Sequence, residues 1–458
     1  MRSAWGLFVG GLGLCWAGLC GAEPWRLASA IGAPDELTLT GAYRLRYEYV
    51  DGRFRAGLSG SDQILVERLL LAAEYDFGHF YAGAELQDSR AQLADAGSPL
   101  GTDDVNSFEL LRGYLGYRAR GVFQAGDNLD LSAGRLTIDV GGRRLIARNG
   151  FRNTINAFTG LNALYAAPGG LELRAFYVIP VDRRPNDFPE LLDNAIAPDV
   201  ENPDLRFWAV QLGKQRLAGD VAGEIYVFGL QEQDRASLSS NDRNLFTPGV
   251  RLRRAPRPGG FDFQLEAAVQ AGQSALSRAA EAPLLSHLAF FTHAQLGYTF
   301  EHPWRPRLNL EYDYASGDRD PQDGRNGRFD TLFGARRFEF GPTGIFGPLS
   351  RSNLNSPGVR LTLQPTPNLS LLLNHRAAFL AARRDALVAA GLRDETGQAG
   401  AFIGHQFEGS LRWDIAPGNV RLETGVAYLA DGRFLREAPN ASPDGDTFYG
   451  FSSVEFSF

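Results

Sequence analysis

The chain has 458 residues, of which 22% are charged and 11% aromatic, and it contains 53 glycines. Its formal charge of -7 gives no indication of a nucleic-acid partner, and we expect none. Beyond residue 22 no run is apolar enough for a transmembrane helix, and the many glycines disfavour a helical protein. Of the 46 basic residues only Lys214 is a lysine, so arginine, with its bidentate affinity for carboxylates, dominates.

Residues 1–22 have the pattern of a secretory signal peptide. Arg2 supplies a positive charge, GLFVGGLGLCWAGL a short apolar core, and CGA the small residues before cleavage after Ala22. Cys15 and Cys20 leave with this segment, so the mature chain has no disulfide and no thiol chemistry. We expect residues 23–40 to form a periplasmic N-terminal segment and residues 41–458 a single domain.

Apolar and polar side chains alternate from residue 41 to the end. In YRLRYEY, Tyr43, Leu45 and Tyr47 take one face of a strand, and Arg44 and Arg46 the other. A soluble sandwich shows the same period, but its core cannot bury so many full charges, whereas a water-filled lumen can. The apolar face is rich in aromatic residues near strand ends, which is typical of outer-membrane barrels.

The connections between the expected strands alternate between short and long. Short ones lie near residues 76, 168, 256, 302, 365 and 416, and long ones near 90–105, 139–158, 181–203, 232–246, 271–289, 317–355, 381–399 and 431–446. This asymmetry predicts an all-β fold: a single 18-stranded antiparallel transmembrane β-barrel in the outer membrane of a Gram-negative bacterium. The first strand is expected near 41–50 and the last near 447–458.

The chain ends in FSSVEFSF, in which Val454, Phe456 and Phe458 alternate with polar residues. A closing barrel strand has this pattern, and such ends resemble the signal that the barrel assembly machinery reads. An exposed terminal strand of another fold is the alternative, which the signal peptide and the alternation disfavour.

Eighteen strands enclose a lumen wide enough for an aqueous channel. Basic residues (Arg112, Arg360) and acidic residues (Glu266, Glu311) both fall on its wet face, so alternation alone does not establish anion selectivity. The densest basic stretch, GGRRLIARNGFRNT at 141–154, contains no acid. If this connection folds into the pore, its arginines Arg143, Arg144, Arg148 and Arg152 offer cationic donors to carboxylates; otherwise it is a solvated surface loop.

No motif indicates a metal, a cofactor or an enzyme. The six histidines have no metal-ligand spacing, and GDRDPQDGRNGRFD at 317–330 does not fit a calcium loop, so we expect a solvated loop there. The mature chain lacks G-x-S-x-G, H-E-x-x-H and P-loop motifs. His405 alternates with Ile403 and Phe407, so it is expected to face lipid, where a hydrolase would need a serine beside it.

Several segments resemble the bacterial alginate export family over most of the mature chain. They are LVERLLLAAEYDFGHFYAGAELQDSRA, LSAGRLTIDVGGRRLIARNGFRNTINAFTG, GRFDTLFG with Thr331 where proline is expected, NHRAAFLAARRDALVAAG, FIGHQFEGSLRWDI and YLADGRFL. The resemblance implies an 18-stranded, monomeric barrel whose arginine-rich constriction passes a polyuronate. The family's pore arginines correspond best to Arg112 and Arg135, and then to Arg46, Arg144, Arg360 and Arg376. Simple alternation points Arg135 outward, and a bulge at Gly134 is expected to turn it inward.

The expected function is passive diffusion of an anionic solute, an alginate-like acidic polysaccharide or its oligomers, through an arginine-lined pore. General uptake of small organic acids or sugars is the first alternative. An outer-membrane hydrolase and a barrel with no open pore are the others. The expected partners are outer-membrane lipids, lipopolysaccharide, the barrel assembly machinery and, for export, a periplasmic secretion complex.

Overall fold

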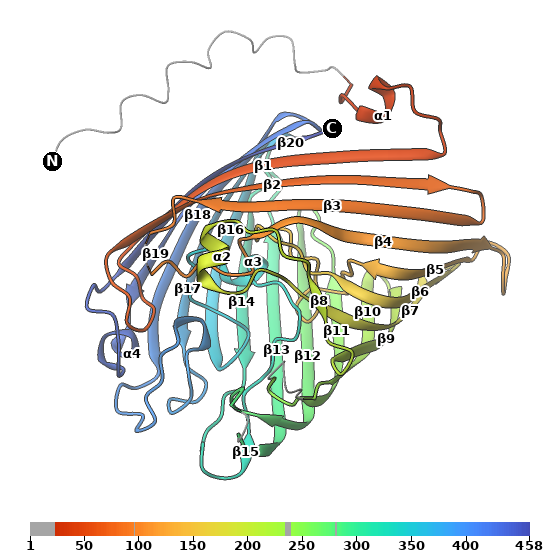
Figure 1. Cartoon of the computed structure of the whole chain (residues 1–458). Coiled ribbons are helices and arrows are strands. Elements are labelled where there is room, and N and C mark those ends of the chain that lie inside the picture. The colour runs from red at the N-terminus through yellow and green to blue at the C-terminus, as the bar shows by residue number, and fades with distance from the viewer. Residues whose placement is uncertain (1–22, 96, 234–239, 280–281) are drawn as a thin grey trace, which may run out of the picture.

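A computed structural model describes residues 23–95, 97–233, 240–279 and 282–458; the expected signal peptide lies outside these ranges. Eighteen long antiparallel strands form one closed barrel, which confirms the predicted fold class (Figure 1). These strands are β1 (Leu37–Asp51), β2 (Ser61–Asp76), β3 (Phe80–Gln92), β4 (Asn106–Arg120), β5 (Asn128–Leu136), β6 (Phe158–Ala167), β7 (Leu171–Asp182), β9 (Arg206–Ala218), β10 (Val221–Gln231), β11 (Asn244–Arg254), β12 (Gly260–Ala275), β13 (Leu284–Thr299), β14 (Arg307–Ala315), β16 (Leu354–Thr366), β17 (Leu369–Phe379), β18 (Phe402–Ala416), β19 (Val420–Asp431) and β20 (Thr447–Ser457).

The remaining elements are short. They are α1 (Leu27–Ala30), α2 (Phe188–Leu192), β8 (Val200–Glu201), β15 (Arg325–Asn326), α3 (Arg337–Phe340), the 3₁₀ turn η1 (Val388–Ala390) and α4 (Arg433–Glu437). In the described part of the chain, no helix has the length and apolar character needed to cross a membrane.

The barrel closes where β1 pairs with β20, in a register that sets Arg44 opposite Glu455 and Tyr47 opposite Ser452. Each of the eighteen barrel strands described is thus paired on both sides, which a membrane requires because lipid offers no hydrogen bonds to a free edge. β1 begins at Leu37, four residues before the predicted start at 41, because Leu37 already pairs with Tyr75 of β2.

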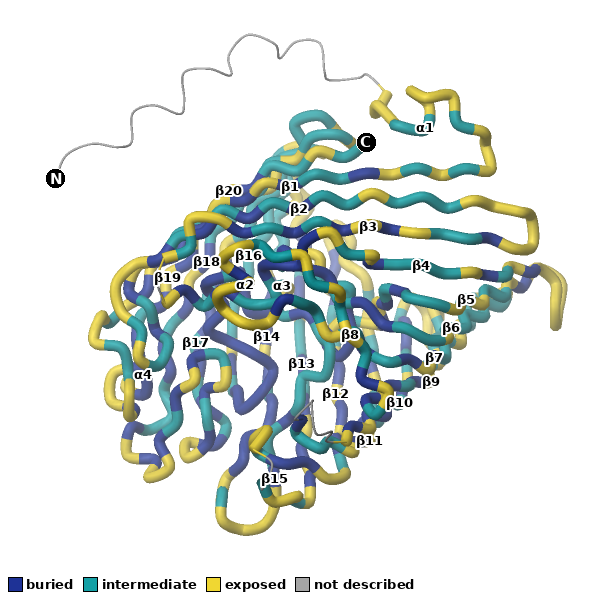
Figure 2. The backbone as a smooth tube through the Cα atoms, in the orientation of Figure 1, coloured by how far each residue is buried: buried dark blue, intermediate teal, exposed yellow. Residues whose placement is uncertain are grey.

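Side chains on successive strand positions have opposite environments, as the alternation predicted. Leu45 and Tyr47 are each 39% exposed on the outer face, whereas Arg46 and Glu48, which alternate with them, are almost completely buried on the inner face. Towards the long connections the inner face becomes apolar: Val50, the next inward residue, belongs to a core cluster. Figure 2 shows buried residues along the strands and inside the barrel, and exposed ones at the connections.

The core of the molecule therefore lies inside the barrel, at the end that carries the long connections. Loop residues such as Phe340, Phe346 and Leu387 pack there against inward residues of the wall. A second cluster packs Phe329 against Phe291 of β13 and includes other wall residues such as Phe207. We call the end with long connections the loop side and the other end the turn side; in outer-membrane barrels the short turns face the periplasm.

Candidate functional site

Two of the long connections meet inside the lumen: residues 137–157 between β5 and β6, and residues 316–353 between β14 and β16. Buried ion pairs hold them to each other and to the wall. The guanidinium of Arg144 lies 2.7 Å from Glu266 of β12 and 2.9 Å from Glu339 of α3. Arg351 contacts the other oxygen of Glu339 at 2.7 Å, and Arg376 of β17 donates to its backbone oxygen. Both connections are thus fixed parts of the lumen.

The Gly141-Gly142 pair allows the first connection to approach the wall closely. Gly141 has a φ of +54°, and a Cβ on it would lie 3.0 Å from the carboxylate of Glu224. A Cβ on Gly142 would lie only 2.3 Å from the Arg144 guanidinium. A side chain at either position would therefore displace a charged group. The next two residues point to different environments: Arg144 inserts between carboxylates, and Arg143 stays exposed to the lumen.

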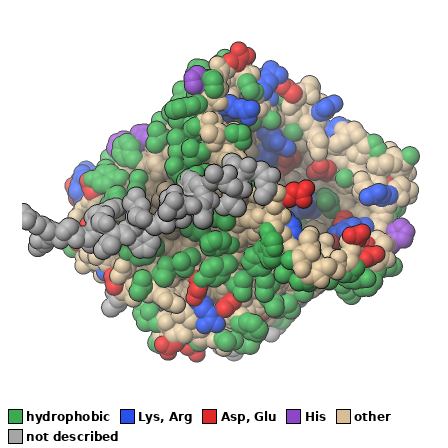
Figure 3. All heavy atoms as spheres, turned by 90° about the horizontal axis from the view of Figure 1, so that it is seen from above, with side chains coloured by type: hydrophobic (Ala, Val, Ile, Leu, Met, Phe, Trp, Pro, Cys, Tyr) green, Lys and Arg blue, Asp and Glu red, His purple; other side chains and the backbone are tan. Residues whose placement is uncertain are grey.

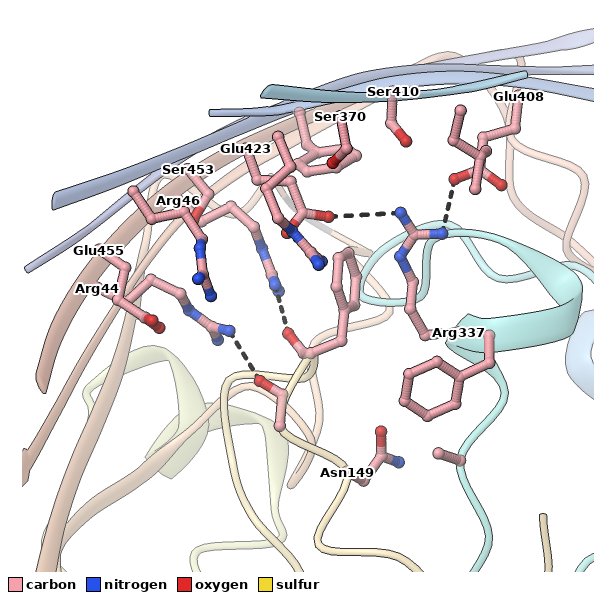
Figure 4. Close-up of a pocket in the computed structure, with 18 of the residues that line it drawn as sticks. Arg44, Arg46, Asn149, Arg337, Ser370, Glu408, Ser410, Glu423, Ser453 and Glu455 are labelled. Carbon is pink, nitrogen blue, oxygen red and sulfur yellow. Dashed lines mark hydrogen bonds and ion pairs between the residues drawn. The ribbon is translucent and has the colours of Figure 1, made fainter. Parts of the chain in front are cut away.

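A cavity of about 550 Å³ lies on the turn side of these connections (Figure 4). Its wall comes from inward residues of β1 and β16–β20, and its floor from residues 147–151 and 335–338. Eight arginines and four carboxylates are among the described residues that line it. The eight arginines are Arg44, Arg46, Arg143, Arg148, Arg337, Arg360, Arg412 and Arg421.

Arg337, at the start of α3, reaches across this cavity between two carboxylates. Its guanidinium lies 2.6 Å from Glu408 and 3.5 Å from Glu423, and over the ring of Phe151. Figure 4 shows Arg44 and Arg46 approaching the same loop from β1, where they donate to the backbone oxygens of Gly150 and Phe151. The β5–β6 connection is therefore held by arginines of the wall as well as by its own arginine, Arg144.

A second cavity, of about 490 Å³, lies on the loop side of the same connections. Its described lining includes five arginines, Arg152, Arg183, Arg243, Arg328 and Arg336, against a single carboxylate, Asp330. Asn149 lines both cavities, and the adjacent Arg336 and Arg337 line one cavity each. The segment around Asn149 and these two arginines thus separates the two cavities.

Carboxylates behind the lining hold many of these arginines in place. Asp103 lies 2.5 Å from Arg152 and 2.6 Å from Arg183. Burial alone would raise the pKa of Asp103, but the charges of Arg152 and Arg183 lower it to about 2, so it stays ionised. Glu85, behind the turn-side cavity, accepts from both Arg148 and Arg112. The guanidinium groups thus line the cavities, and these carboxylates lie behind them. Figure 3 shows Lys and Arg side chains gathered in a hollow of the face seen from above.

The sequence model for alginate export matches residues 35–446, nearly the whole barrel. The chain belongs to the alginate export family. Comparison with curated proteins gives no match. The resemblance found in the sequence is therefore confirmed, and family membership together with the closed barrel identifies an outer-membrane channel.

Solved structures from Pseudomonas aeruginosa share this fold. OccK2 (OpdF) is 13% identical, with a TM-score of 0.59 over 93% of this chain and 98% of that one. The outer membrane protein OpdK is 12% identical, with a TM-score of 0.56 over 92% and 99%. OccK2 in complex with glucuronate is also 12% identical, with a TM-score of 0.56 over 92% of this chain and 96% of that one. At these identities the likeness is one of fold.

The eight arginines proposed from the sequence of this family member divide into two groups. Four line the turn-side cavity: Arg46, Arg143, Arg148 and Arg360. The other four, Arg112, Arg135, Arg144 and Arg376, line neither cavity, and each is held in an ion pair. Arg376 is completely buried, 2.7 Å from both Glu311 and Asp313.

The bulge expected at Gly134 is not present. Gly134 pairs with Tyr114 on one side and Gly160 on the other, and the register of β5 is unbroken. Arg135 pairs instead with Glu109 at 2.7 Å and with Glu201 of β8 at 3.2 Å. The register shift in this region lies between β3 and β4, at Glu85.

The sequence reasoning did not propose Arg336 and Arg337, although ARRFEF carries a signal: two adjacent arginines before alternating aromatic and acidic residues. It also treated 317–330 as a solvated loop. Asp320 and Asp323 are indeed exposed, but Arg328 and Asp330 at the end of that segment line the loop-side cavity.

No group of three or more potential metal ligands occurs among the residues that the structure describes. His405 lies beside His375 of β17, with 3.1 Å between ring nitrogens, and the rings stack. The hydrogen-bond partner of His405 in the described structure is thus a second histidine, not the serine that a hydrolase would need.

Proposed function

We propose that this member of the alginate export family conducts anionic solutes, above all an acidic polysaccharide or its oligomers, by passive diffusion across the outer membrane. The solute would cross the turn-side and loop-side cavities in turn, passing Asn149. The proposal assigns no catalytic step and no cofactor to the chain.

The excess of arginine over carboxylate in the lining of both cavities carries this proposal. Eight arginines face four carboxylates on the turn side, and five face one on the loop side. Guanidinium groups in a narrow, partly desolvated lumen lower the electrostatic barrier for carboxylates and raise it for cations. Family membership supports the choice of a polyuronate, and the glucuronate complex of OccK2 supports uronates more generally.

Passage along a chain of arginines requires binding that stays weak at each position. Ion pairs with Glu408, Glu423 and Glu85 meet that need, because a guanidinium already shared with a carboxylate binds a second one less tightly.

Uptake of small organic acids is the second candidate, and the structures of OpdK with vanillate and of OccK2 with glucuronate, which share this fold, support it. Export of a polymer would require a periplasmic secretion complex at the turn side, whereas uptake would not. We further propose that residues 1–22 direct export of the chain, that the barrel assembly machinery inserts it as a monomer, and that lipid and lipopolysaccharide contact its outer face.

The test is single-channel recording of the purified protein in a planar bilayer, under a salt gradient and with added oligouronates of increasing length. A reversal potential on the anion side, with blockade that strengthens from monomer to trimer, supports passage of a polymer. Anion preference with equal blockade by monomer and trimer favours the uptake channel. A cation-preferring pore would overturn the proposal.

A further inference from the structure

Arg143 differs from the other arginines of the turn-side cavity. It ends a tight turn in which its backbone nitrogen donates to the oxygen of Val140 at 2.8 Å, and its own φ is +59°. Its side chain is exposed, and within the described structure no carboxylate lies at ion-pair distance from it. A solute carboxylate would therefore meet an unshared guanidinium at this point.

The partner of Arg143 is an aromatic ring. The guanidinium carbon lies 3.9 Å from the centroid of the Phe338 ring, the usual geometry of a cation–π contact. Phe338 is 40% exposed although it lies in the interior of the barrel. Its neighbours on α3, Glu339 and Phe340, are buried and anchor the helix, so the ring is held at the cavity from a fixed support.

A charged group and an apolar face side by side match the chemistry of a uronate residue. The sugar carries one carboxylate and a pyranose ring whose C–H groups present an apolar face. A guanidinium binds the first, and an aromatic ring packs against the second. An acyclic carboxylate of equal charge offers only the first contact.

We propose that Arg143 and Phe338 form a subsite for one pyranose uronate residue within the pore, which separates cyclic uronates from acyclic carboxylates. The inference rests on the proposed function and deepens it, because Arg143 supplies general anion attraction and Phe338 supplies selection for the sugar ring. Arg337, beside Phe338 in the chain, is shared between Glu408 and Glu423 and stays outside the subsite.

The experiment compares blockade of the full-length channel by trigalacturonate and by citrate, two probes with three carboxylates each, and by neutral maltotriose. The variants are Phe338→Ala, Phe338→Leu and Arg143→Gln. Arg412→Gln is the matched control, since Arg412 lines the same cavity but pairs with Glu423. Heat-modifiable migration in gels and unit conductance establish that each variant is folded.

We expect Phe338→Ala to shorten the dwell time of trigalacturonate about two- to fivefold and to leave that of citrate unchanged. Phe338→Leu, which keeps an apolar side chain but not the aromatic ring, should also shorten the dwell time of trigalacturonate. Arg143→Gln should shorten both dwell times, and Arg412→Gln should alter them less. If wild type is blocked by trigalacturonate and Phe338→Ala changes neither dwell time, or both equally, the subsite is wrong and the anion channel stands.

The two proposals fail separately. A wild-type pore that prefers cations, or that neither anionic probe blocks, overturns the proposed function and the subsite with it. A wild-type pore that maltotriose blocks as strongly as trigalacturonate also overturns the subsite, because the carboxylate would then add nothing.

Discussion

Arg143 and Arg144 are neighbours in the chain, yet one guanidinium faces the lumen over Phe338 and the other lies buried between Glu266 and Glu339. The buried one joins three parts of the molecule: the β5–β6 connection, the barrel wall and α3. The exposed one is available to a solute. A single basic pair thus supplies both the anchor of the pore loop and a charge in the pore.

The anchoring role predicts that Arg144→Gln destabilises the protein. Glu266 and Glu339 would each lose a charged partner while 4% exposed, and breaking a buried pair in this way costs about 3–5 kcal/mol. The temperature at which half of the protein shows the heat-dependent gel shift, measured in detergent, should be clearly lower than in wild type. Arg143→Gln is the control and should leave it within a degree or two of wild type, because surface changes stay within about 0.5 kcal/mol. Equal losses in both variants would contradict the division of roles.

The position of Arg337 predicts a change in ion selectivity. Arg337→Gln removes the guanidinium that Glu408 and Glu423 share, so Glu408 faces the cavity without this partner while Glu423 keeps Arg412. The reversal potential under a salt gradient should move towards cations. Arg412→Gln removes the same charge from a side chain that is 53% exposed, where salt screens it more effectively, so its shift should be smaller. A larger shift in Arg412→Gln would argue against a path past α3.

The barrel itself was predictable from the sequence, because outward and inward residues alternate along each strand of a membrane barrel and differ in polarity. Leu45 and Tyr47 face outward and Arg46 lies inside for the same local reason, and the strand count follows from the alternation of short and long connections. The alternation of apolar and polar residues at the C-terminus correctly predicted the closing strand, in which Phe456 pairs with Tyr43 of β1.

The site was only partly predictable, since period-two alternation gives no direction to a side chain in a connection. What separates Arg143 from Arg144 is Glu266, 122 residues further along the chain from Arg144. For the same reason Arg337 was missed: its partners Glu408 and Glu423 come from β18 and β19. Inward arginines such as Arg376 were correctly placed inside the barrel, but their burial depends on the loops that fill it.

A buried carboxyl on the loop side predicts a pH-dependent stability. Asp104, in the β3–β4 connection, is 4% exposed. Burial raises its pKa from 3.8 to about 7; the charges of Asp103 and Glu48 add to the rise, and the Gly101 amide and Arg46 oppose it. The folded protein therefore holds a proton that the unfolded chain releases, so stability falls as pH rises through this window.

Asp104→Asn mimics the protonated carboxyl. It should match wild type near pH 4 and exceed its stability by an amount that grows up to about pH 7, reaching on the order of a few kcal/mol at pH 8. The measurement is the half-point of the heat-dependent gel shift at pH 4, 6 and 8. Asp320→Asn, at an exposed position of another connection, is the control and should show no such trend. A constant difference between Asp104→Asn and wild type at all three pH values would contradict the assignment.

On the turn side, one asparagine joins the N-terminal segment around Trp25 to the closing strand β20. Asn419, in the β18–β19 turn, accepts from the backbone nitrogen of Trp25 at 2.8 Å, and its amide donates to the backbone oxygens of Trp25 and Ser457 at 2.9 and 2.7 Å. The Trp25 ring lies 6.1 Å from that of Phe458. One side chain thus ties the N-terminal segment to the closing strand.

Asn419→Ala should release that segment and leave the barrel intact, because the backbone bond from Ser457 to the oxygen of residue 419 remains. Each lost hydrogen bond is worth about 1 kcal/mol, so trypsin should cut after Arg26 several-fold faster, as followed by mass spectrometry. Asn368→Ala in the β16–β17 turn is the matched control, since Asn368 accepts from Asp414 through its backbone oxygen. Equal cleavage rates in the two variants would show that Asn419 does not hold the segment, and that packing of Trp25 on Phe458 suffices.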